Sequence, residues 1–323
     1  MKNQTDIPVL HTEGDNIPEV WENSIVKLYN YGLWYNRTGR KDKDQLQLDS
    51  TMTMVIKDPS SSLKVHNYLS CGWGDLFEYQ MELLGAKDSW VDKSGKSSRW
   101  SYHYHERLTD YPSESGIKTD QIEEIIKKLK EKPATRQATA ITWIPEKDNK
   151  SDDPPCLQRI WFSLIPNGNN YDDVTLNMNY NFRSRNVMIA APMNQFGLVT
   201  LQIYMRDRLS EETGKNISLG RIVDFVDSYH VSARDQSTLE GFIERLTESK
   251  KKGETINDRI IPQEIVIEHI GSLKDSINEK VINQTGQHLS GENLESEIKK
   301  IKRISDQVWA IDQRYMQDSK ENA

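Results

Sequence analysis

The sequence contains little cysteine, no long apolar segment and no excess of positive charge. Its 323 residues include two cysteines, Cys71 and Cys156, which are too few for a disulfide framework and favour a reducing, cytoplasmic environment. No apolar run approaches the roughly 18 residues of a membrane-spanning helix, and Met1 to Asp6 lack the apolar core of a signal peptide. The net charge of −7 gives no general attraction to nucleic acid or anionic lipid. We therefore expect a soluble protein with neither nucleic-acid nor membrane partners.

What is present is the composition of an ordinary folded protein. Hydrophobic residues make up 36% of the chain and charged residues 28%, and eight Trp with thirteen Tyr argue against disorder. A chain of this length can form one large domain or two smaller ones, and either can bury a full core.

Four segments show the alternation of apolar and polar residues that indicates β-strands. They are residues 51–56, 138–143, 157–165 and 174–180, and the last alternates at every step. The segment from Pro166 to Asn170 separates the last two and has the residues of a hairpin connection.

Helical patterns lie between and after these strands. Asp120 can cap a helix that ends before Pro133, and another helix is expected from Asn194 to Leu209. Ser237 to Glu240 fits a capping box, and the polar sequence from Glu248 to Glu254 indicates a solvated connection. Residues 294–315 keep one stripe of a long helix apolar, which suits packing on the body or on another subunit. Strands with interspersed helices predict an α+β protein.

A cysteine follows two prolines in the segment Asp152 to Cys156. The prolines stiffen the backbone just before a thiol that opens an alternating strand. Such a thiol can attack a carbon electrophile where nearby cations favour the thiolate, although a single cysteine is more often a small buried apolar residue.

Three further groups of residues can bind a polar ligand. Arg183 and Arg185 flank Ser184 at a strand end, which suits a phosphate or a surface salt-bridge loop. Asn194 lies near a helix start, where an amide can cap the helix or read a base edge. His230 lies in a block of hydrogen-bonding residues, as a structural donor or as a base.

Together these pieces resemble the thymidylate synthase superfamily. The resemblance runs from about Trp21 to Leu246, roughly 70% of the chain, and each motif alone is modest. Their order along the chain is specific, and it outweighs the structural interpretations of the single motifs. The motifs are Arg37-Thr38-Gly39, Arg136, Pro154-Pro155-Cys156, Arg183-Ser184, Pro192-Met193-Asn194 and His230.

The resemblance implies a thymidylate-synthase-like fold, a mixed sheet with packed helices, over residues 1–250, and a mainly helical extension over 251–323. It also implies folate-dependent transfer of a one-carbon unit to C5 of a pyrimidine nucleoside 5'-monophosphate, with 5,10-methylenetetrahydrofolate as co-substrate. Cys156 matches the nucleophile that adds to C6. Arg183 matches a residue that binds phosphate and helps to activate the thiol, and Ser184 a phosphate donor. No metal site is assigned.

Other substrate contacts follow from the same resemblance. Arg37 matches the phosphate loop, and Arg136 matches an arginine that crosses the interface of a homodimer into the neighbour's site. The usual second arginine is Gln137 here, which puts one phosphate contact in doubt. Asn194 matches the asparagine that reads the O4/N3 edge of the pyrimidine, and His230 a ribose-hydroxyl contact.

The catalytic carboxylate and the folate contacts are less sharply placed. The family's catalytic glutamate begins a helical Glu-Leu-Leu-Trp-type motif seven residues before a glycine. Glu78 stands seven residues before Gly85, and Glu82 is the competitor. A carboxylate there organises water and relays protons. Trp90 and Tyr102 lie where the family has a folate-stacking tryptophan and a water-binding tyrosine.

Several departures bear on which reaction is performed. The family's usual Arg-Ser-x-Asp motif reads Arg183-Ser184-Arg185-Asn186 here. Ala190 stands where the family has a glycine, and Leu157 where a histidine commonly follows the nucleophile. Ser232 stands where a tyrosine binds the sugar, so sugar recognition must differ.

The ending Asp318 to Ala323 differs from the short apolar tail that closes a thymidylate synthase site. Hydride transfer, which gives a methyl product, needs water excluded, whereas water addition gives hydroxymethyl. This ending, the Asp-Ser-Tyr-His block and the length favour a CMP or dCMP hydroxymethylase-like enzyme. Asn194 argues for uracil, because a known deoxycytidylate hydroxymethylase type carries Asp there. The alternatives are a thymidylate synthase acting on dUMP or UMP, and a non-catalytic nucleotide-binding homologue.

Overall fold

The protein is built around one mixed β-sheet. The structure is a computed structural model that describes residues 6–36, 46–61, 64–91, 102–112 and 116–321. The strands are β1 (Val9–Gly14), β2 (Leu33–Asn36), β3 (Leu46–Ile56), β4 (Val65–His66), β5 (Thr139–Ile141), β6 (Leu157–Asn167), β7 (Asn170–Phe182), β8 (Arg185–Asn186), β9 (Asn216–Val231) and β10 (Ile260–Ile261). The main sheet has the order β1-β3-β9-β7-β6-β5, with β2 on β3 and β8 on β9, while β4 and β10 form a separate pair.

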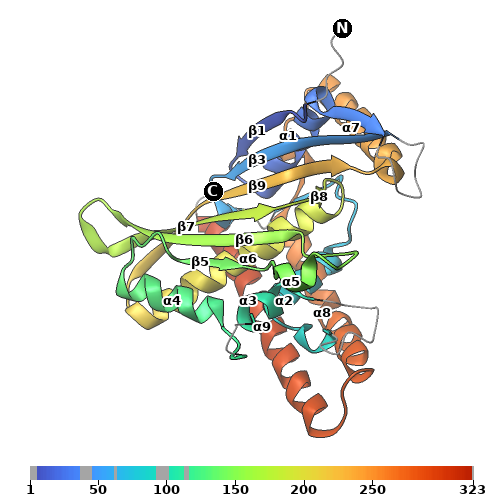
Figure 1. Cartoon of the computed structure of the whole chain (residues 1–323). Helices are drawn as coiled ribbons and strands as arrows, with labels where there is room; N and C mark the ends of the chain where they lie inside the picture. The colour runs from blue at the N-terminus through green and yellow to red at the C-terminus, as the bar shows by residue number, and fades with distance from the viewer. Residues whose placement is uncertain (1–5, 37–45, 62–63, 92–101, 113–115, 322–323) are drawn as a thin grey trace.

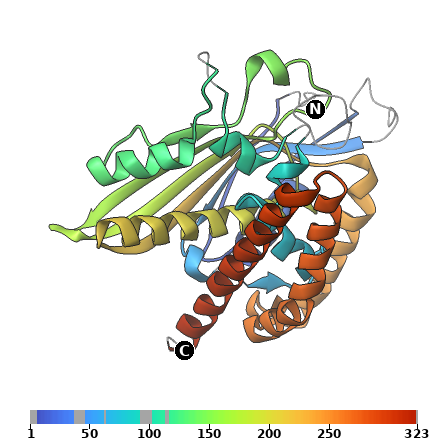
Figure 2. The same cartoon turned by 90° about the horizontal axis from the view of Figure 1, so that it is seen from below.

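Helices cover one face of this sheet and then one another. They are α1 (Ile17–Tyr31), α2 (Trp73–Leu83), α3 (Tyr104–Thr109), α4 (Gln121–Glu131), α5 (Pro145–Asp148), α6 (Ala190–Thr213), α7 (Gln236–Lys251), α8 (Gln263–Gly286) and α9 (Gly291–Glu321). Figure 1 looks onto the strands with α6 behind them. In Figure 2, α6, α8 and α9 lie on the same side of the sheet, and α2 packs on all three. The expected α+β class is confirmed.

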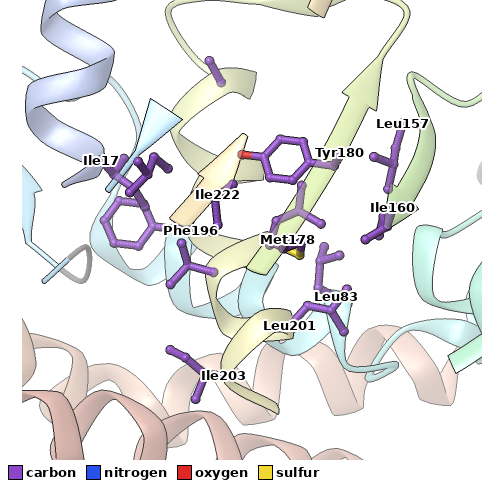
Figure 3. Close-up of a cluster of buried hydrophobic side chains, with 14 of the residues drawn as sticks. Ile17, Leu83, Leu157, Ile160, Met178, Tyr180, Phe196, Leu201, Ile203 and Ile222 are labelled. Atoms are coloured by element: carbon purple, nitrogen blue, oxygen red, sulfur yellow. The ribbon is translucent and has the colours of Figure 1, made fainter. Parts of the chain in front are cut away.

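Alternating residues of the central strands form the core between the sheet and α6. Along β3, Met52 and Met54 are fully buried while Thr51 and Thr53 are half-buried, as the period of a strand requires. On β7, Leu176 and Met178 are likewise fully buried. Figure 3 shows this cluster, where side chains of the strands and of α6 meet.

Strand β9 lies in the middle of the sheet, parallel to β7 and antiparallel to β3. No strand is expected there from the sequence, because the core-facing side of β9 includes Gly220 and the fully buried Asp224. Asp224 accepts a short hydrogen bond of 2.5 Å from Arg185, which is also buried. The acidic residue thus occupies a core position because its charge is paired, which alternation of apolar residues does not reveal.

Most expected elements are confirmed, with different ends. Asp120 accepts from the Glu123 N–H and caps α4, and β6 and β7 form the expected hairpin, with Gly168 at a φ of 64°. The capping box at Ser237 is wrong: α7 begins at Gln236, directly after a 3₁₀ turn at residues 233–235, so Ser237 already lies inside the helix. That helix also runs on to Lys251, through most of the expected connection.

A buried ion pair joins α1, near the start of the chain, to Arg259, the residue before β10. Both side-chain oxygens of Glu22 on α1 accept from Arg259, at 2.7 and 2.8 Å, and one lies 3.0 Å from His66. Burial alone would raise the pKa of Glu22, but hydrogen bonds from His66 and Arg259 and the charge of Arg259 hold it at about 2. Beyond Arg259 the chain forms α8 and α9. No helix in the described part of the chain is long and apolar enough to cross a bilayer.

Candidate active site

The β6–β7 hairpin brings the cysteine and the arginine of the expected site together. Cys156 precedes β6 and Arg183 follows β7, and the two strands pair with Leu157 opposite Phe182. Arg183 donates through Nε to the Pro155 carbonyl at 3.0 Å and through Nη2 to the Pro154 carbonyl at 2.6 Å. Its backbone N–H donates to the Cys156 carbonyl at 2.8 Å. The guanidinium therefore fixes the two-proline turn that carries the thiol.

Charges of both signs lie near the Cys156 thiol. Burial raises the pKa of the Cys156 thiol, and the positive charges of Arg183 and Arg185 oppose that shift while Asp153 adds to it. A thiol in this setting is protonated until a further positive charge or a ligand changes the balance.

Tyr102 and Tyr104 lie beside the thiol, and Tyr79 lies next to these two tyrosines; we call the three the tyrosine cluster. The Tyr104 hydroxyl accepts from the Leu157 N–H at 3.3 Å, and the rings of Tyr102 and Tyr104 lie 5.6 Å apart. Burial raises the pKa of both, and a charge on Cys156 adds to the shift. The cluster thus presents neutral hydroxyl groups beside the cysteine.

Asn194 belongs to the same space. It lies inside the first turns of α6 and does not cap the helix, which begins at Ala190. Its Nδ2 donates to the Tyr79 hydroxyl at 2.5 Å, and only 7% of its surface is exposed. The amide that is expected to read a base is therefore oriented by a tyrosine of α2.

The expected sugar and phosphate contacts gather at the end of β9. The Ser228 N–H donates to the Arg183 carbonyl at 3.3 Å, and Asn186 of β8 pairs with His230 of β9. His230 Nδ1 lies 3.2 Å from the Ser228 carbonyl. These pairings bring Ser184, His230 and Ser232 onto the same end of the sheet as Arg183.

Ser232 is part of a small polar network at that end. Its hydroxyl donates to Asp235 and accepts from Asn186 Nδ2 at 3.2 Å. Asn186 also donates to Asp235 at 2.6 Å. Because these partners occupy Ser232, this serine is positioned by its own protein neighbours.

Of the other two expected phosphate arginines, the structure describes one. Arg136 is exposed just before the edge strand β5, and its carbonyl accepts from the Trp161 indole at 3.2 Å. Arg37 lies outside the residues that the structure describes.

The two candidate glutamates share one lysine. Lys87 Nζ lies 2.8 Å from Glu78 Oε1 and 3.0 Å from Glu82 Oε2. The other oxygen of Glu78 contacts Lys280 of α8 at 2.6 Å, and the other oxygen of Glu82 lies 3.1 Å from His103 Nδ1. We call Glu78, Glu82, Lys87 and Lys280 the carboxylate cluster.

The two glutamates differ in what they face. Glu78 contacts Lys280 of α8. Glu82 instead lies close enough to Tyr79 that its negative charge adds to the rise in the pKa of Tyr79 caused by burial. Burial alone would raise the pKa of each glutamate, but the neighbouring cations, with His103 at Glu82, hold it below its ordinary value. Both are ionised at neutral pH, and Glu82 is the one electrostatically linked to the tyrosine cluster.

Trp90 lies beside the carboxylate cluster and beneath α8. Its indole N–H donates to the Thr285 hydroxyl at 2.8 Å, and Lys87 Nζ lies 5.0 Å from the ring centroid. Only 7% of its surface is exposed. Tyr102, in contrast, is half-buried and directly coupled to Cys156.

A buried ion pair that the motifs do not reveal supports this arrangement. Arg107 on α3 binds both oxygens of Asp148 on α5, at 3.0 and 2.9 Å, and its guanidinium lies 5.5 Å from the Tyr102 ring centroid. The pair connects α3, whose first residue is Tyr104, to the segment that leads into the cysteine turn. No local pattern signals it, because the partners are separated by 41 residues.

Known proteins are similar to this chain in sequence. The family model described as thymidylate synthase matches residues 1–259. A protein of Methanococcoides burtonii named "Putative thymidylate synthase" is 28% identical over 228 residues, covering 70% of this chain and 91% of its own. A relative of the same name in Methanosarcina mazei is 29% identical over 203 residues, covering 62% and 81%.

A solved structure supports the fold independently. Thermostable thymidylate synthase A of Bacillus subtilis has a TM-score of 0.52 to this chain at 16% identity, covering 71% of this chain and 84% of its own. The thymidylate-synthase-like fold expected from the motifs is thereby confirmed. With a family model that covers residues 1–259, the chain belongs to the thymidylate synthase family, whose members are one-carbon transferases that use methylenetetrahydrofolate as co-substrate.

Proposed function

We propose that this chain transfers a one-carbon unit to C5 of a pyrimidine nucleoside 5'-monophosphate, with Cys156 as the nucleophile. The observation that carries the proposal is the placement of the thiol. Arg183 holds the turn before Cys156, the tyrosine cluster lies beside it, and Asn194 is aimed into the same space. A nucleophile, a cation and a reader of the base edge are what addition to a pyrimidine ring requires.

The proposed roles follow from these contacts. The Cys156 sulfur adds to C6 of the base, and the electron pair of the C5–C6 double bond becomes available at C5. Arg183 and Ser184 bind the phosphate, which brings a negative charge beside the guanidinium and seats the base over the thiol. Asn194 reads the O4/N3 edge, and His230 with Ser232 contacts the sugar.

The co-substrate supplies the one-carbon unit at the oxidation level of formaldehyde. We propose Tyr102 and Trp90 as its contacts, and Tyr102 is the better placed, because its partly exposed ring adjoins Cys156 whereas Trp90 is nearly buried. The aromatic and hydrogen-bonding groups at this position fit a folate ring. The glutamates of the carboxylate cluster are the proposed proton relay, with Glu78 the first candidate and Glu82 the second.

We propose hydroxymethyl as the product. Once C5 has taken up the one-carbon unit, loss of the C5 proton and departure of tetrahydrofolate leave a methylene group on C5. Addition of water to that group needs a held water molecule, and the hydroxyls of the tyrosine cluster offer several donors and acceptors close to the cysteine. The second candidate is a methyl product, as the name of the relatives suggests. Cytosine and uracil nucleotides are both candidate substrates.

We also propose a homodimer with shared sites, as members of the family are typically dimeric. The face of the sheet opposite α6 carries half-buried side chains such as Thr53, Asn179 and Phe225, and helices leave much of it open (Figure 1). Arg136 is exposed at the edge of this sheet, where it can reach a neighbouring subunit.

One experiment tests the chemistry directly. The protein is incubated with methylenetetrahydrofolate and each of UMP, dUMP, CMP and dCMP, and the product is weighed by mass spectrometry. Cys156→Ser should abolish turnover while leaving the fold intact, because a hydroxyl is a far poorer nucleophile near neutral pH. If the variant keeps more than about a tenth of the wild-type activity, covalent catalysis through Cys156 is wrong.

Covalent trapping distinguishes an enzyme from a binding protein. A 5-fluoropyrimidine nucleotide with methylenetetrahydrofolate should form a stable adduct with the wild-type chain and none with Cys156→Ser. A protein that only binds nucleotides would release both ligands on denaturation.

A further inference from the structure

Helix α8 lies beyond the residues that the family model matches, yet it is docked along α2. The ring centroids of His269 and Trp73 lie 4.9 Å apart near the start of both helices. Two turns further along α8, Ile277 packs on Gly74, where an added Cβ would lie 3.4 Å from the isoleucine Cδ1. Lys280 then reaches Glu78, and Thr285 reaches Trp90. Contacts therefore continue along most of the helix.

The carboxylate cluster is neutral only when Lys280 is counted. Glu78 and Glu82 bring two negative charges, and their side chains are almost buried. Lys87 supplies one positive charge to both, and Lys280 supplies the other to Glu78 alone. Without Lys280, one lysine would face two carboxylates, and buried like charges favour uptake of a proton.

We propose that Lys280 is a positioning residue for the reaction: it fixes one oxygen of Glu78 and supplies the second positive charge that the carboxylate cluster requires. The C-terminal extension would thus complete the site that residues 1–259 form. This inference rests on the proposed function of Glu78 as a proton relay, and it adds a residue from α8, to which no role is otherwise assigned.

The inference has a consequence for the pH dependence of turnover. The charged or titratable groups around the carboxylates come from α2 itself (Glu78, Glu82), the turn after it (Lys87), the segment before α3 (His103) and α8 (Lys280). Burial raises the pKa of Glu78, and the two lysines reverse that effect.

Loss of Lys280 should therefore raise the pKa of Glu78. Because half of the Lys280 side chain is exposed and screened by solvent, the expected shift is about one unit, at the low end for a close ion pair.

The catalytic test compares Lys280→Met with Lys280→Arg. Methionine keeps an unbranched apolar side chain without the charge, and arginine restores the charge. The acid limb of kcat/KM for the nucleotide should move up by about one pH unit in Lys280→Met and return in Lys280→Arg.

Lys274→Met is the matched control on the same helix. Lys274 pairs with Asp306 of α9 and has no contact with Glu78 among the described interactions, so its profile should stay unchanged. An acid limb that is the same in wild type and Lys280→Met would overturn the proposal, whatever the effect on kcat.

A second measurement does not depend on turnover. Denaturant unfolding of wild type, Lys280→Met, Glu78→Gln and the double variant gives the coupling between the two side chains. Because the pKa of Glu78 is lowered in the folded protein, the coupling should be present near pH 8 and disappear as the pH falls below the pKa of Glu78.

The two measurements separate the possible failures. Absence of coupling at pH 8 overturns the inference about Lys280. Coupling in a wild-type protein that turns over no pyrimidine nucleotide supports the ion pair and refutes the proposed function instead.

Discussion

Asp312 on α9 is a buried carboxylate to which the described part of the chain supplies no cation, and its replacement by asparagine should stabilise the protein. Only 4% of its surface is exposed, and burial raises its pKa to about 7. The Gln80 amide, which donates to it at 3.1 Å, opposes this shift only in part. The carboxylate lines a cavity of about 20 Å³ between α2, α6, α8 and α9, which has room for one water molecule.

The size of the effect follows from the pKa difference. An unfolded aspartate titrates near 3.8, so the difference between folded and unfolded states is about three units, or about 4 kcal/mol. Because the pKa is raised by folding, this stability is fully present below pH 4 and is lost as the pH rises to about 7. Water entry into the cavity reduces the penalty, so Asp312→Asn should gain about 2–4 kcal/mol at pH 8. The asparagine oxygen still accepts from Gln80.

The assay is guanidinium unfolding at pH 5 and at pH 8. The gain of Asp312→Asn over wild type should be larger at pH 8 than at pH 5. Asp306→Asn, on the same helix with 73% of its side chain exposed, is the control and should change little at either pH. A variant that is less stable than wild type at pH 8 would refute the reasoning. It would mean that the ionised Asp312 side chain stabilises the folded protein more than a neutral side chain does.

Two further predictions concern the proposed site. Mixing inactive Cys156→Ser with inactive Arg136→Ala subunits should restore partial activity, because one site of each heterodimer would be whole; no recovery after confirmed subunit exchange would argue against a shared site. Asn194→Asp should shift the ratio of kcat/KM toward cytosine nucleotides by roughly five- to a hundredfold, since a mismatched buried polar group costs about 1–3 kcal/mol. An active variant with an unchanged ratio would show that Asn194 does not face the base.

The sequence predicts the turn that carries the candidate nucleophile well, because its residues lie close along the chain. Pro154, Pro155 and Cys156 form one short motif, and the alternation on either side of the hairpin at Gly168 places Arg183 opposite it. A period of two and a turn are local properties, so they can be read from single segments. The expected roles of these residues stay predictions until turnover is measured.

Interactions between distant segments are what the sequence does not reveal. Tyr79 orients Asn194 across 115 residues, and Glu78 meets Lys280 across 202. Neither partner has a pattern of its own, since a tyrosine or lysine on a helix surface is ordinary in composition. The division at residue 250 also remains a prediction, and the contacts of α8 with α2 connect the two proposed parts closely.

The position of β9 affects how the chain folds during synthesis. Strands β1 to β3 are made first, yet in the sheet they reach β7, β6 and β5 only through β9, which begins at Asn216. At about 5–20 residues per second, the edge of β3 that later pairs with β9 stays unpaired on the ribosome for on the order of ten seconds or more. An open apolar edge is a template for pairing with other chains. The nascent polypeptide therefore exposes a strand edge that β9 covers in the completed sheet.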